Sequence, residues 1–397
     1  MQPLAVTDYT LVTALGSGRA ASFDALTAGR SGLAQRDFEA AALGAWIGVV
    51  DGLDAVRLPA ALAAWDCRNN RLAEAGLRAD DFAAAVARSA ARWGAARVGV
   101  FVGTSTSGIL QTEIAYRRRD GASGALPAWL DYEKTHNMAS VARYVRAALG
   151  LAGPAFVVST ACSSSAKVFA SAARMIGAGL IEAAVVGGVD SLCMTTLYGF
   201  RSLELVSSDI CRPWDAERAG LSIGEGAAFA LLVRTPTADA PPRAWLLGSG
   251  ESSDGHHMSA PHPDGAGAEL AMRAALADAG LAPDDIGYVN LHGTATPGND
   301  AAEDRAVSRV FGVACACSST KGYTGHTLGA AGAVEAALTM LALERGWLPP
   351  TLNLRTPDPA LALPVLRAPL ARRVRAAASN SFGFGGSNAC LVLGAQA

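Results

Sequence analysis

The stretch Val157-Val158-Ser159-Thr160-Ala161-Cys162-Ser163-Ser164-Ser165-Ala166-Lys167 decides the fold that this sequence predicts. The apolar residues 156–158 predict the end of a buried strand, and an Ala- and Ser-rich run to about Gly177 predicts a helix. Cys162 lies at the turn between them, so we expect backbone N–H groups at the helix N-terminus to favour its thiolate and to lower its pKa. The alternative is a small apolar residue buried in a core, as free cysteines usually are. This stretch alone does not choose between a nucleophile and a core residue.

Length, composition and charge indicate a globular protein with a large core. The chain has 397 residues, which suggests two domains at a typical size of about 150 residues each. Hydrophobic residues make up 51% and charged residues 17% of the chain, which argues against disorder. The net charge of −2 argues against a nucleic-acid-binding protein that works through bulk positive charge.

The cysteines and the apolar runs together predict a cytoplasmic protein. Seven scattered cysteines form no disulfide framework and no metal-ligand spacing, which suits a reducing compartment. No basic segment precedes the first apolar residues, so we expect no secretory signal. The longest uncharged apolar run, residues 40–50, is too short to cross a bilayer, so we expect no membrane association.

Strand-like apolar runs alternate with helical patterns along the chain. Strands are predicted at residues 97–103, 156–158, 183–189, 288–291 and 389–393. Helices are predicted at residues 61–93, 109–116, 132–149, 269–279 and 329–345. This alternation predicts an α/β layered architecture with a mostly parallel sheet. A proline-rich composition shift at residues 235–242 predicts a linker that divides the chain into 1–236 and 237–397.

Three polar loops follow apolar runs in the second half of the chain, at residues 290–297, 318–326 and 380–388. Functional groups gather at strand ends in open α/β sheets, so we expect these loops to share one site. The glycines at 383–386 do not predict a phosphate cradle, because a strand pattern and not a helix follows them.

The motifs in these loops resemble one family when they are taken together. The cysteine stretch is followed by H-G-T-x-T-P at 292–297, S-T-K-x-x-T-G-H at 319–326, L-G-A-A-G-x-x-E at 328–335 and N-S-F-G-F-G-G-x-N at 380–388. C-R-P-W-D at 211–215 with G-E-G-A-A at 224–228 adds a sixth match. The chain thereby resembles, over essentially its whole length, the β-ketoacyl-acyl-carrier-protein synthases of the elongating KAS I/KAS II type in the thiolase superfamily. The resemblance implies a dimeric, five-layered α-β-α-β-α fold of two similar halves, with the nucleophile in 1–236 and the catalytic histidines in 237–397.

The chemistry of such an enzyme needs the residue types that these motifs carry. A decarboxylative Claisen condensation needs a nucleophile that holds an acyl group as a thioester, and Cys162 fits that task. It also needs donors that stabilise an enolate while a malonyl thioester loses CO2, and the imidazole N–H groups of His292 and His326 fit that task. Lys321, one of only three lysines in the chain, would keep the site positive and orient it. The product is a 3-oxoacyl-carrier protein of fatty acid or type II polyketide synthesis.

The resemblance implies roles for further residues. The backbone N–H of Phe384 would form a second oxyanion hole with that of Cys162, and Glu303 and Glu335 would support the lysine and histidine network. The expected substrate-binding residues, for the phosphopantetheine arm or the acyl chain, are Thr294, Thr296, Phe200, Phe382 and Thr106. No metal or redox cofactor is expected, because the substrates are carried on the phosphopantetheine of acyl carrier protein. That partner is acidic, so the entrance should be basic; the candidates are Arg68, Arg71 and residues 117–119, and a solvated charged face is the alternative.

Related functions make different demands on the sequence. A biosynthetic thiolase would carry a second cysteine in the C-terminal glycine loop, and a KAS III or chalcone-synthase-like enzyme an asparagine in place of His326. The remaining alternative is a chain-length-factor-like partner subunit of the same fold, which lacks the nucleophile that Cys162 supplies here. The motifs at 103–108 and 292–297 are closer to ketosynthases of aryl polyene and related polyketide pathways. The expected assembly is therefore a homodimer, or a heterodimer with a chain-length-factor-like subunit.

Overall fold

The structure is a computed structural model that describes residues 1–237 and 240–396. Its two halves have the same strand order. When the five main strands of a half are numbered along the chain, they lie side by side in the order first, fifth, fourth, second and third. In the first half this order is β1 (Leu4–Thr13), β9 (Gly226–Val233), β7 (Ala183–Asp190), β5 (Val98–Gly103) and β6 (Ala155–Val158). In the second half it is β10 (Ala244–Ser253), β16 (Ser387–Ala395), β15 (Ala376–Gly383), β11 (Ile286–Asn290) and β12 (Cys317–Ser318).

Both halves also share strand direction and are joined edge to edge. The strands β6, β5 and β7 are parallel, as are β12, β11 and β15, while the remaining pairings in each half are antiparallel. Antiparallel pairing of β1 with β10 at Leu4–Leu246, Ala5–Trp245 and Val6–Ala244 makes the two sheets continuous.

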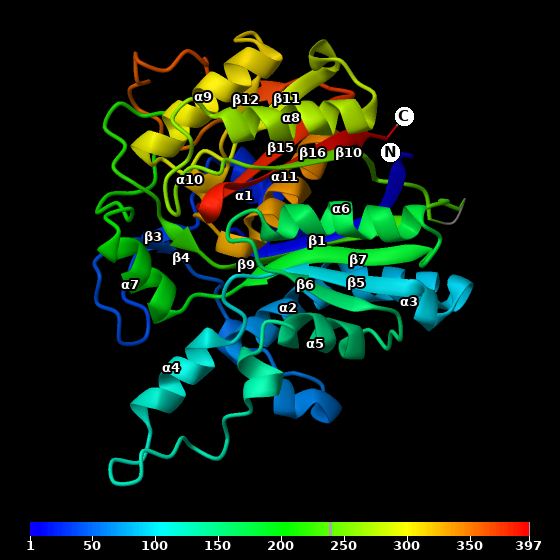
Figure 1. Ribbon diagram of the computed structural model, residues 1–397, viewed down its shortest axis with the longest axis vertical. Helices are drawn as coiled ribbons and strands as arrows, with labels where there is room; N and C mark the ends of the chain where they lie inside the picture. Colours follow the sequence, from blue (N-terminus) through cyan, green and yellow to red (C-terminus); the bar gives the residue numbers. More distant parts are fainter. Residues whose placement is uncertain (238–239, 397) are drawn as a thin grey trace.

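Helices form three layers around the two sheets (Figure 1). The middle layer contains α6 (Ser164–Gly177) and α11 (Ala331–Arg345), which pack on each other and on strands of both halves. The outer helices on the first half are α2 (Arg68–Arg78), α3 (Phe82–Trp93) and α5 (Ser140–Ala148). Those on the second half are α8 (Ala266–Ala279) and α9 (Pro297–Phe311). The predicted α/β fold of two similar halves in five α-β-α-β-α layers is confirmed.

Of the two middle helices, α11 is the one that protein encloses on all sides. Every residue of α11 from Ala331 to Leu343 is buried, which a helix that is apolar on all sides requires. Close packing there depends on glycine: a Cβ added at Gly332 would lie 2.5 Å from the backbone nitrogen of Ala166 in α6. The L-G-A-A-G motif therefore lets α11 approach the helix that follows Cys162.

Smaller elements complete the described chain. The remaining strands are β2 (Gly16–Ser17), β3 (Leu33–Gln35), β4 (Trp46–Gly48), β8 (Ile223–Gly224), β13 (Trp347–Leu348) and β14 (Leu370–Ala371). The remaining α-helices are α1 (Gly18–Thr27), α4 (Ile109–Arg117), α7 (Met194–Ser202) and α10 (Lys321–Thr324). Short segments of other helix types lie at η1 (Leu53–Ala55), η2 (Ala60–Trp65), η3 (Ala79–Asp81), η4 (Ala95–Arg97), η5 (Tyr132–His136), η6 (Pro283–Asp285), η7 (Leu328–Ala330) and η8 (Phe384–Gly386).

Two long stretches predicted as helical are interrupted. The stretch 61–93 contains α2 and α3, separated by Asp80 and Asp81, which have left-handed φ values of 55° and 57°. The Asp80 carboxylate accepts hydrogen bonds from the Arg19 N–H and the Thr10 hydroxyl, which secures that bend. In the stretch 132–149 the helix begins only at Ser140, because the Asn137 side chain accepts from the Ala139 N–H in a local turn.

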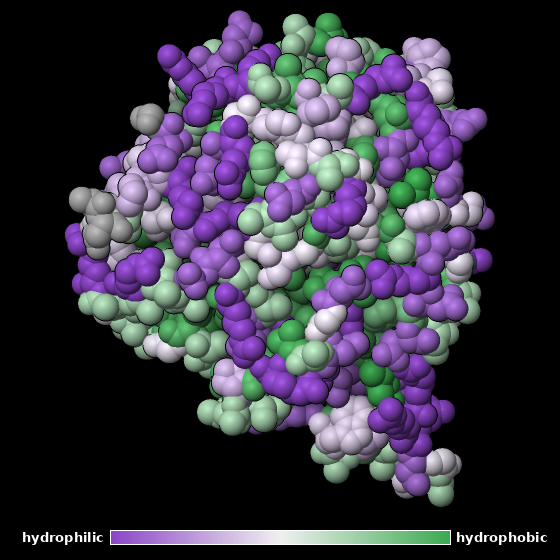
Figure 2. All heavy atoms as spheres, turned by 180° about the vertical axis from the view of Figure 1, so that it is seen from behind, coloured by the Kyte–Doolittle hydropathy of each residue, from purple (hydrophilic) through white to green (hydrophobic). Residues whose placement is uncertain are grey.

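Residues 109–139, called the arm below, project from the body of the first half at the lower left of Figure 1. The arm begins with α4 and ends with η5, and Tyr116, Trp129 and Tyr132 are exposed on it. Seen from behind, it forms a lobe on which hydrophobic and hydrophilic residues alternate (Figure 2).

The predicted boundary between residues 236 and 237 lies in the segment that joins β9 to β10. Ala238 and Asp239 of the predicted linker lie outside the described residues, so the division at this point stays a prediction. Among the helices of the described residues, none combines the length and the hydropathy that a membrane crossing requires.

Candidate active site

Cys162 lies in the turn between β6 and α6, two residues before the helix begins at Ser164. The preceding residue, Ala161, has a left-handed φ of 53°, which is uncommon for a residue with a side chain. The Ser164 hydroxyl holds this turn, because it donates to the Ala161 carbonyl at 2.5 Å and accepts from the Thr160 N–H at 2.8 Å. A strained turn at the end of a strand therefore presents the sulfur, as in a nucleophile elbow.

His326 is the side chain that meets the sulfur. Its Nε2 lies 2.9 Å from the Cys162 Sγ, a contact between residues 164 positions apart. Its backbone is held on both sides: its N–H donates to the Ser222 carbonyl at 2.7 Å, and its carbonyl accepts from the Gly224 N–H at 3.0 Å. The S-T-K-x-x-T-G-H loop therefore places one imidazole directly against the thiol.

His292 follows β11 and lies beside His326, with ring centroids 5.3 Å apart and ring planes at 86°. The Lys321 Nζ lies 3.3 Å from its Nδ1. An ammonium group only donates, so Nδ1 accepts and the ring proton of His292 is on Nε2. The Glu303 carboxylate on α9 accepts the N–H groups of His292 at 2.7 Å and Gly293 at 2.8 Å, which fixes the loop. His292 is thereby prepared as an N–H donor.

Lys321 and Glu335 form a fully buried ion pair behind the histidines. The Lys321 Nζ donates to the Glu335 Oε1 on α11 and to the His292 carbonyl. Burial raises the pKa of Glu335 to about 7, and the Lys321 ammonium opposes that rise. Burial likewise raises the pKa of Glu303 to about 7, against the hydrogen bonds it accepts. Burial of a carboxylate is costly unless an opposite charge or hydrogen bonds compensate for the lost solvation. Lys321 compensates at Glu335, and the N–H groups of His292 and Gly293 compensate at Glu303.

We expect Lys321→Met to lower the free energy of unfolding by about 3–5 kcal/mol, because the Glu335 carboxyl then has to be buried either charged without a partner or protonated. The double variant Lys321→Met/Glu335→Gln should recover a large part of that loss, since neither charge remains. Denaturant unfolding of the wild type and of these variants measures both effects. A double variant as unstable as the sum of its single changes would contradict the pairing.

Both histidines are neutral near pH 7. Burial, followed by the positive charge of Lys321, holds the pKa of His292 well below its usual range, and the same two causes act on the pKa of His326. The expected lowering of the Cys162 pKa is wrong: burial raises it to about 12, and Lys321 and the Phe384 N–H oppose the rise only in part. Desolvation therefore outweighs the nearby helix N-terminus, and the resting site holds a thiol beside neutral imidazoles.

The rate of Cys162 alkylation by iodoacetamide should rise by about tenfold per pH unit from pH 7 to pH 10, because only the thiolate reacts and its pKa lies above this range. Peptide mass spectrometry assigns the adduct to Cys162. A free thiol is the comparison, because its alkylation rate levels off above its pKa of about 8.5. A plateau for Cys162 below pH 9 would contradict this charge state.

A cavity of about 180 Å³ opens at the sulfur. Its walls include Cys162, Phe200, His292, Thr294, Thr296, His326, Phe382 and Phe384, all of them predicted site residues. The rings of Phe200 and Phe384 stack with centroids 5.4 Å apart, and the hydroxyls of Thr294 and Thr296 lie 2.9 Å apart. The structure thus brings together predicted site residues from five separate segments of the chain. Lys321, Glu303 and Glu335 stand behind this wall.

Thr106 is not brought to this cavity. Its side chain is buried, and its hydroxyl and N–H both donate to the Asp190 Oδ1, at 2.8 and 2.9 Å. Asp190, at the end of β7, also accepts from the Thr104 hydroxyl at 2.6 Å and from the Gly329 N–H at 2.6 Å. It ties the loop after β5 to the segment that follows His326. Sequence reasoning missed Asp190, although an acidic residue directly after an apolar strand is a usable signal.

The predicted basic entrance is only partly present. Arg68 is nearly buried and donates to Glu225, and Arg71 pairs with Asp66 through two hydrogen bonds of 2.6 Å. Both guanidinium groups are therefore engaged within the protein. Residues 117–119 are exposed at the end of α4 on the arm.

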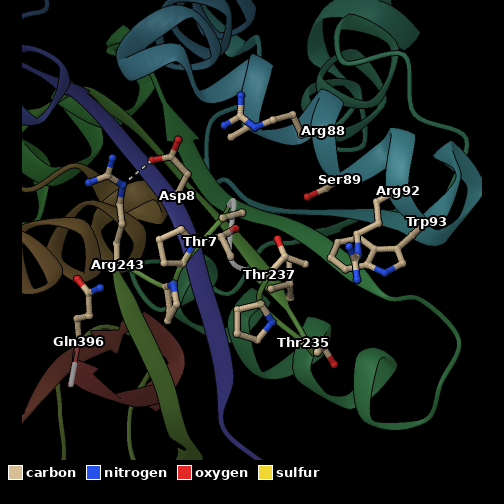
Figure 3. Close-up of a pocket in the computed structure, with 16 residues that line it drawn as sticks. Thr7, Asp8, Arg88, Ser89, Arg92, Trp93, Thr235, Thr237, Arg243 and Gln396 are labelled. Atoms are coloured by element: carbon tan, nitrogen blue, oxygen red, sulfur yellow. Dashed lines mark ion pairs between the residues drawn. The ribbon is translucent and has the colours of Figure 1, made fainter.

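A second cavity, of about 350 Å³, lies between α3, β1 and the segments flanking residues 238–239 (Figure 3). It contains Arg88, Arg92 and Arg243, the last paired with Asp8 at 3.2 Å. It shares no lining residue with the cavity at Cys162, and its described walls hold no cysteine or histidine. The smaller cavity is therefore the candidate active site.

Comparison with known proteins agrees with this geometry. The N-terminal domain model of β-ketoacyl synthases matches residues 59–238, and the C-terminal domain model matches residues 243–355. The chain belongs to the β-ketoacyl synthase family. The predicted family and its reaction class, the acyl-transferring condensation of fatty acid and polyketide synthesis, are confirmed.

Curated relatives of this β-ketoacyl synthase cover three quarters of it. Nodulation protein E of Rhizobium meliloti is 39% identical over 306 residues, 75% of each chain. The 3-oxoacyl-[acyl-carrier-protein] synthase 2 of Vibrio cholerae is 37% identical over 317 residues, 75% of this chain and 76% of that protein.

Among solved structures, a ketosynthase in complex with its chain length factor from Xenorhabdus doucetiae has a TM-score of 0.89 at 37% identity and covers 100% of this chain and 98% of its own. A β-ketoacyl synthase from Burkholderia phymatum has a TM-score of 0.86 at 31% identity, with 100% of both chains covered. The thiolase-like fold of the synthase is the fold of these relatives.

Proposed function

We propose that this synthase condenses an acyl group held on Cys162 with a malonyl group on an acyl carrier protein. The observation that carries the proposal is the juxtaposition of Cys162, His326 and His292 in one cavity, with Sγ and Nε2 2.9 Å apart. The reaction follows a ping-pong order, in which acyl transfer to the cysteine precedes condensation.

In the first step the Cys162 sulfur attacks the thioester carbonyl of the acyl carrier. The thiol proton leaves through the His326 Nε2 and reaches the departing phosphopantetheine thiol. The Phe384 N–H lies within hydrogen-bonding reach of the sulfur, and with the Cys162 N–H it forms the oxyanion hole for this transfer. Because the resting thiol has a raised pKa, this proton transfer and the attack have to occur together.

In the second step a malonyl carrier loses CO2 and becomes an enolate. Once the acyl group is on the sulfur, His326 exchanges its ring proton from Nδ1 to Nε2 through solvent. The Nε2–H groups of the neutral His292 and His326 then stabilise the enolate oxygen, and Lys321 keeps His292 in the donor tautomer. The enolate carbon attacks the acyl carbonyl, the Cys162 thiolate departs and takes up one proton, and a 3-oxoacyl carrier is released. One proton is consumed for each CO2 formed.

The test supplies the purified protein with an acyl-acyl carrier protein and malonyl-acyl carrier protein. Intact-mass spectrometry should show one acyl mass on Cys162 first, and then the 3-oxoacyl carrier with release of CO2. Profiling acyl groups from C2 to C16 and polyenes identifies the preferred chain. Failure to acylate Cys162 with every carrier would overturn the proposal.

The proposed reaction uses no metal or redox cofactor. The carried groups arrive on phosphopantetheine, and the adjacent hydroxyls of Thr294 and Thr296 on the cavity wall are suited to hydrogen-bond that arm. Donor atoms of Cys162, His292 and His326 lie within 4.8 Å of one another, so a soft metal ion would compete with the acyl group for the sulfur. Chelators should leave turnover unchanged.

We also propose a dimer, formed through the free edge of β6. This strand ends the sheet, carries no charge, and leaves Phe156 51% exposed. An uncharged, uncovered edge strand is a pairing surface that monomeric proteins avoid. The exposed aromatic residues of the arm lie in the same half of the molecule. The relative from Xenorhabdus doucetiae forms a complex with a chain length factor, so a related subunit or a second copy fits this edge.

Phe156→Lys should convert the dimer into monomers, because it places a charge in the proposed pairing edge. Light scattering coupled to gel filtration measures the mass of wild type and variant. Leu180→Lys, which changes another exposed apolar residue away from this strand, is the matched control. A wild-type chain that stays monomeric both alone and with a candidate chain length factor contradicts the proposal.

A chain-length-factor-like role is the second candidate, and the site argues against it. Such a subunit needs no nucleophile, whereas this chain has Cys162 in contact with His326. We also propose a cytoplasmic location, which the seven free thiols of the chain support.

A further inference from the structure

Helix α7 supplies one residue to the wall of the active-site cavity, and most of the helix lies at the surface. Phe200, in its last turn, lines the cavity and stacks on Phe384. Of the nine residues of α7, only Leu197 is buried. Near the C-terminus of α7, Arg201 donates to the Leu43 carbonyl at 2.6 Å. The position of this aromatic gate, defined as Phe200 with Phe384, therefore depends on how the two ends of the helix are held.

The N-terminus of α7 is held from outside by the arm. The first N–H groups of a helix have no partner within it, and the residue before α7, Cys193, supplies no side-chain cap. Glu113 on α4 supplies it instead: its carboxylate accepts from the Met194 N–H at 3.0 Å and from the Thr195 N–H at 2.6 Å. The Thr195 hydroxyl donates to it as well, at 2.5 Å.

This contact is a specific one. Two backbone N–H groups and a hydroxyl converge on a single carboxylate, whose negative charge also suits the helix N-terminus. Figure 1 shows α4 at the base of the arm, close below α7, and the two helices pack on each other. Glu113 itself does not line the cavity.

We infer that Glu113 is a positioning residue that holds α7, and through it the Phe200–Phe384 gate, and so sets how the site discriminates between acyl chains. The inference rests on the proposed function, because it concerns access to Cys162. With the cap removed, α7 shifts more freely, Phe200 leaves Phe384, and bulky groups reach the sulfur more readily than before.

The direct test measures gate opening without catalysis. Alkylation of Cys162 by a dodecyl-chain iodoacetamide is compared with alkylation by iodoacetamide itself in the wild type, Glu113→Ala and Glu113→Gln. We expect the ratio of the two rates to rise at least about fivefold in Glu113→Ala. The ratio for Glu113→Gln should lie between those of the wild type and Glu113→Ala, because glutamine keeps one acceptor oxygen but turns an NH2 group toward an N–H donor.

Two controls separate positioning from a general loss of structure. Glu133→Ala removes the same charge from the same arm, at a carboxylate that contacts Arg143 and not α7, and should leave the ratio unchanged. In a Phe200→Ala background, Glu113→Ala should cause no further change, since the gate is already absent. The inference would be overturned if Glu113→Ala accelerated alkylation by both reagents equally. It would also be overturned if Glu113→Ala raised the ratio as much in the Phe200→Ala background as in the wild type.

The catalytic counterpart distinguishes this inference from the proposed function. For Glu113→Ala, kcat/KM with a dodecanoyl carrier should rise relative to kcat/KM with an acetyl carrier, by a factor similar to the alkylation ratio. If the wild type forms no 3-oxoacyl product while the alkylation ratio still changes, the proposed function fails and the positioning role of Glu113 stands. An unchanged alkylation ratio in a folded Glu113→Ala variant overturns the inference, whatever the activity.

Discussion

Cys162→Ala is expected to prevent acyl-enzyme formation and to lower condensation by at least about a thousandfold, because the chain then lacks the atom that holds the acyl group. Intact-mass spectrometry after incubation with an acyl carrier measures the first effect, and assay of the 3-oxoacyl product measures the second. The cysteine is buried and small, so replacement by alanine leaves little empty space.

Cys193→Ala is the matched control for this experiment, because Cys193 is equally buried but outside the lining of the cavity. It should keep both acylation and turnover. Acylation that survives in Cys162→Ala would contradict the nucleophile assignment, and so would its loss in Cys193→Ala with Cys162 intact.

His292→Ala is expected to lower malonyl decarboxylation by about a hundred- to a thousandfold, the usual effect of removing one oxyanion donor. Transfer of the acyl group to Cys162 should change by much less, because in this structure the imidazole in contact with the sulfur is that of His326. Release of CO2 from malonyl carrier and the rate of acyl-enzyme formation are measured separately in the same variant.

His326→Ala completes this comparison. It removes both a donor for the enolate and the group that receives the thiol proton, so it should slow both half-reactions. Equal losses of decarboxylation and acylation in His292→Ala would contradict the division of roles between the two histidines.

The fold and most of the site were predictable because they depend on local patterns. Cys162 lies between a strand and a helix, and loops that contain His292 and His326 follow strands in the other half of the chain. Chain direction alone brings the ends of parallel strands to one edge of a sheet, so residues far apart in sequence converge there. Order and spacing of the motifs then identified the family.

The electrostatic state of the site was not predictable in the same way. A helix N-terminus beside Cys162 suggested a lowered pKa, but burial raises it to about 12. Likewise Arg68 is engaged by Glu225, a residue 157 positions away, so a charge that looked available on a helix is not. Both outcomes depend on the surroundings of the side chain in three dimensions, and desolvation is a property of those surroundings.

The contacts of Asp190 and Glu113 could not be predicted from the sequence either. Each acts through hydrogen bonds to backbone N–H groups of distant segments, at Gly329 and at Met194 respectively. Neither belongs to a motif, because a carboxylate that caps another element is recognised only when the two elements are in contact.

The sequence by itself therefore determined the layered α/β fold and singled out Cys162, His292 and His326 as candidate site residues, since strand and helix periodicity and short motifs are properties of neighbouring residues. Tertiary structure alone decided the protonation of Cys162, the tautomer of His292 and the contact of Glu113 with the N-terminus of α7. These depend on burial and on partners up to hundreds of residues away, and only the folded chain brings those groups within a hydrogen bond of each other.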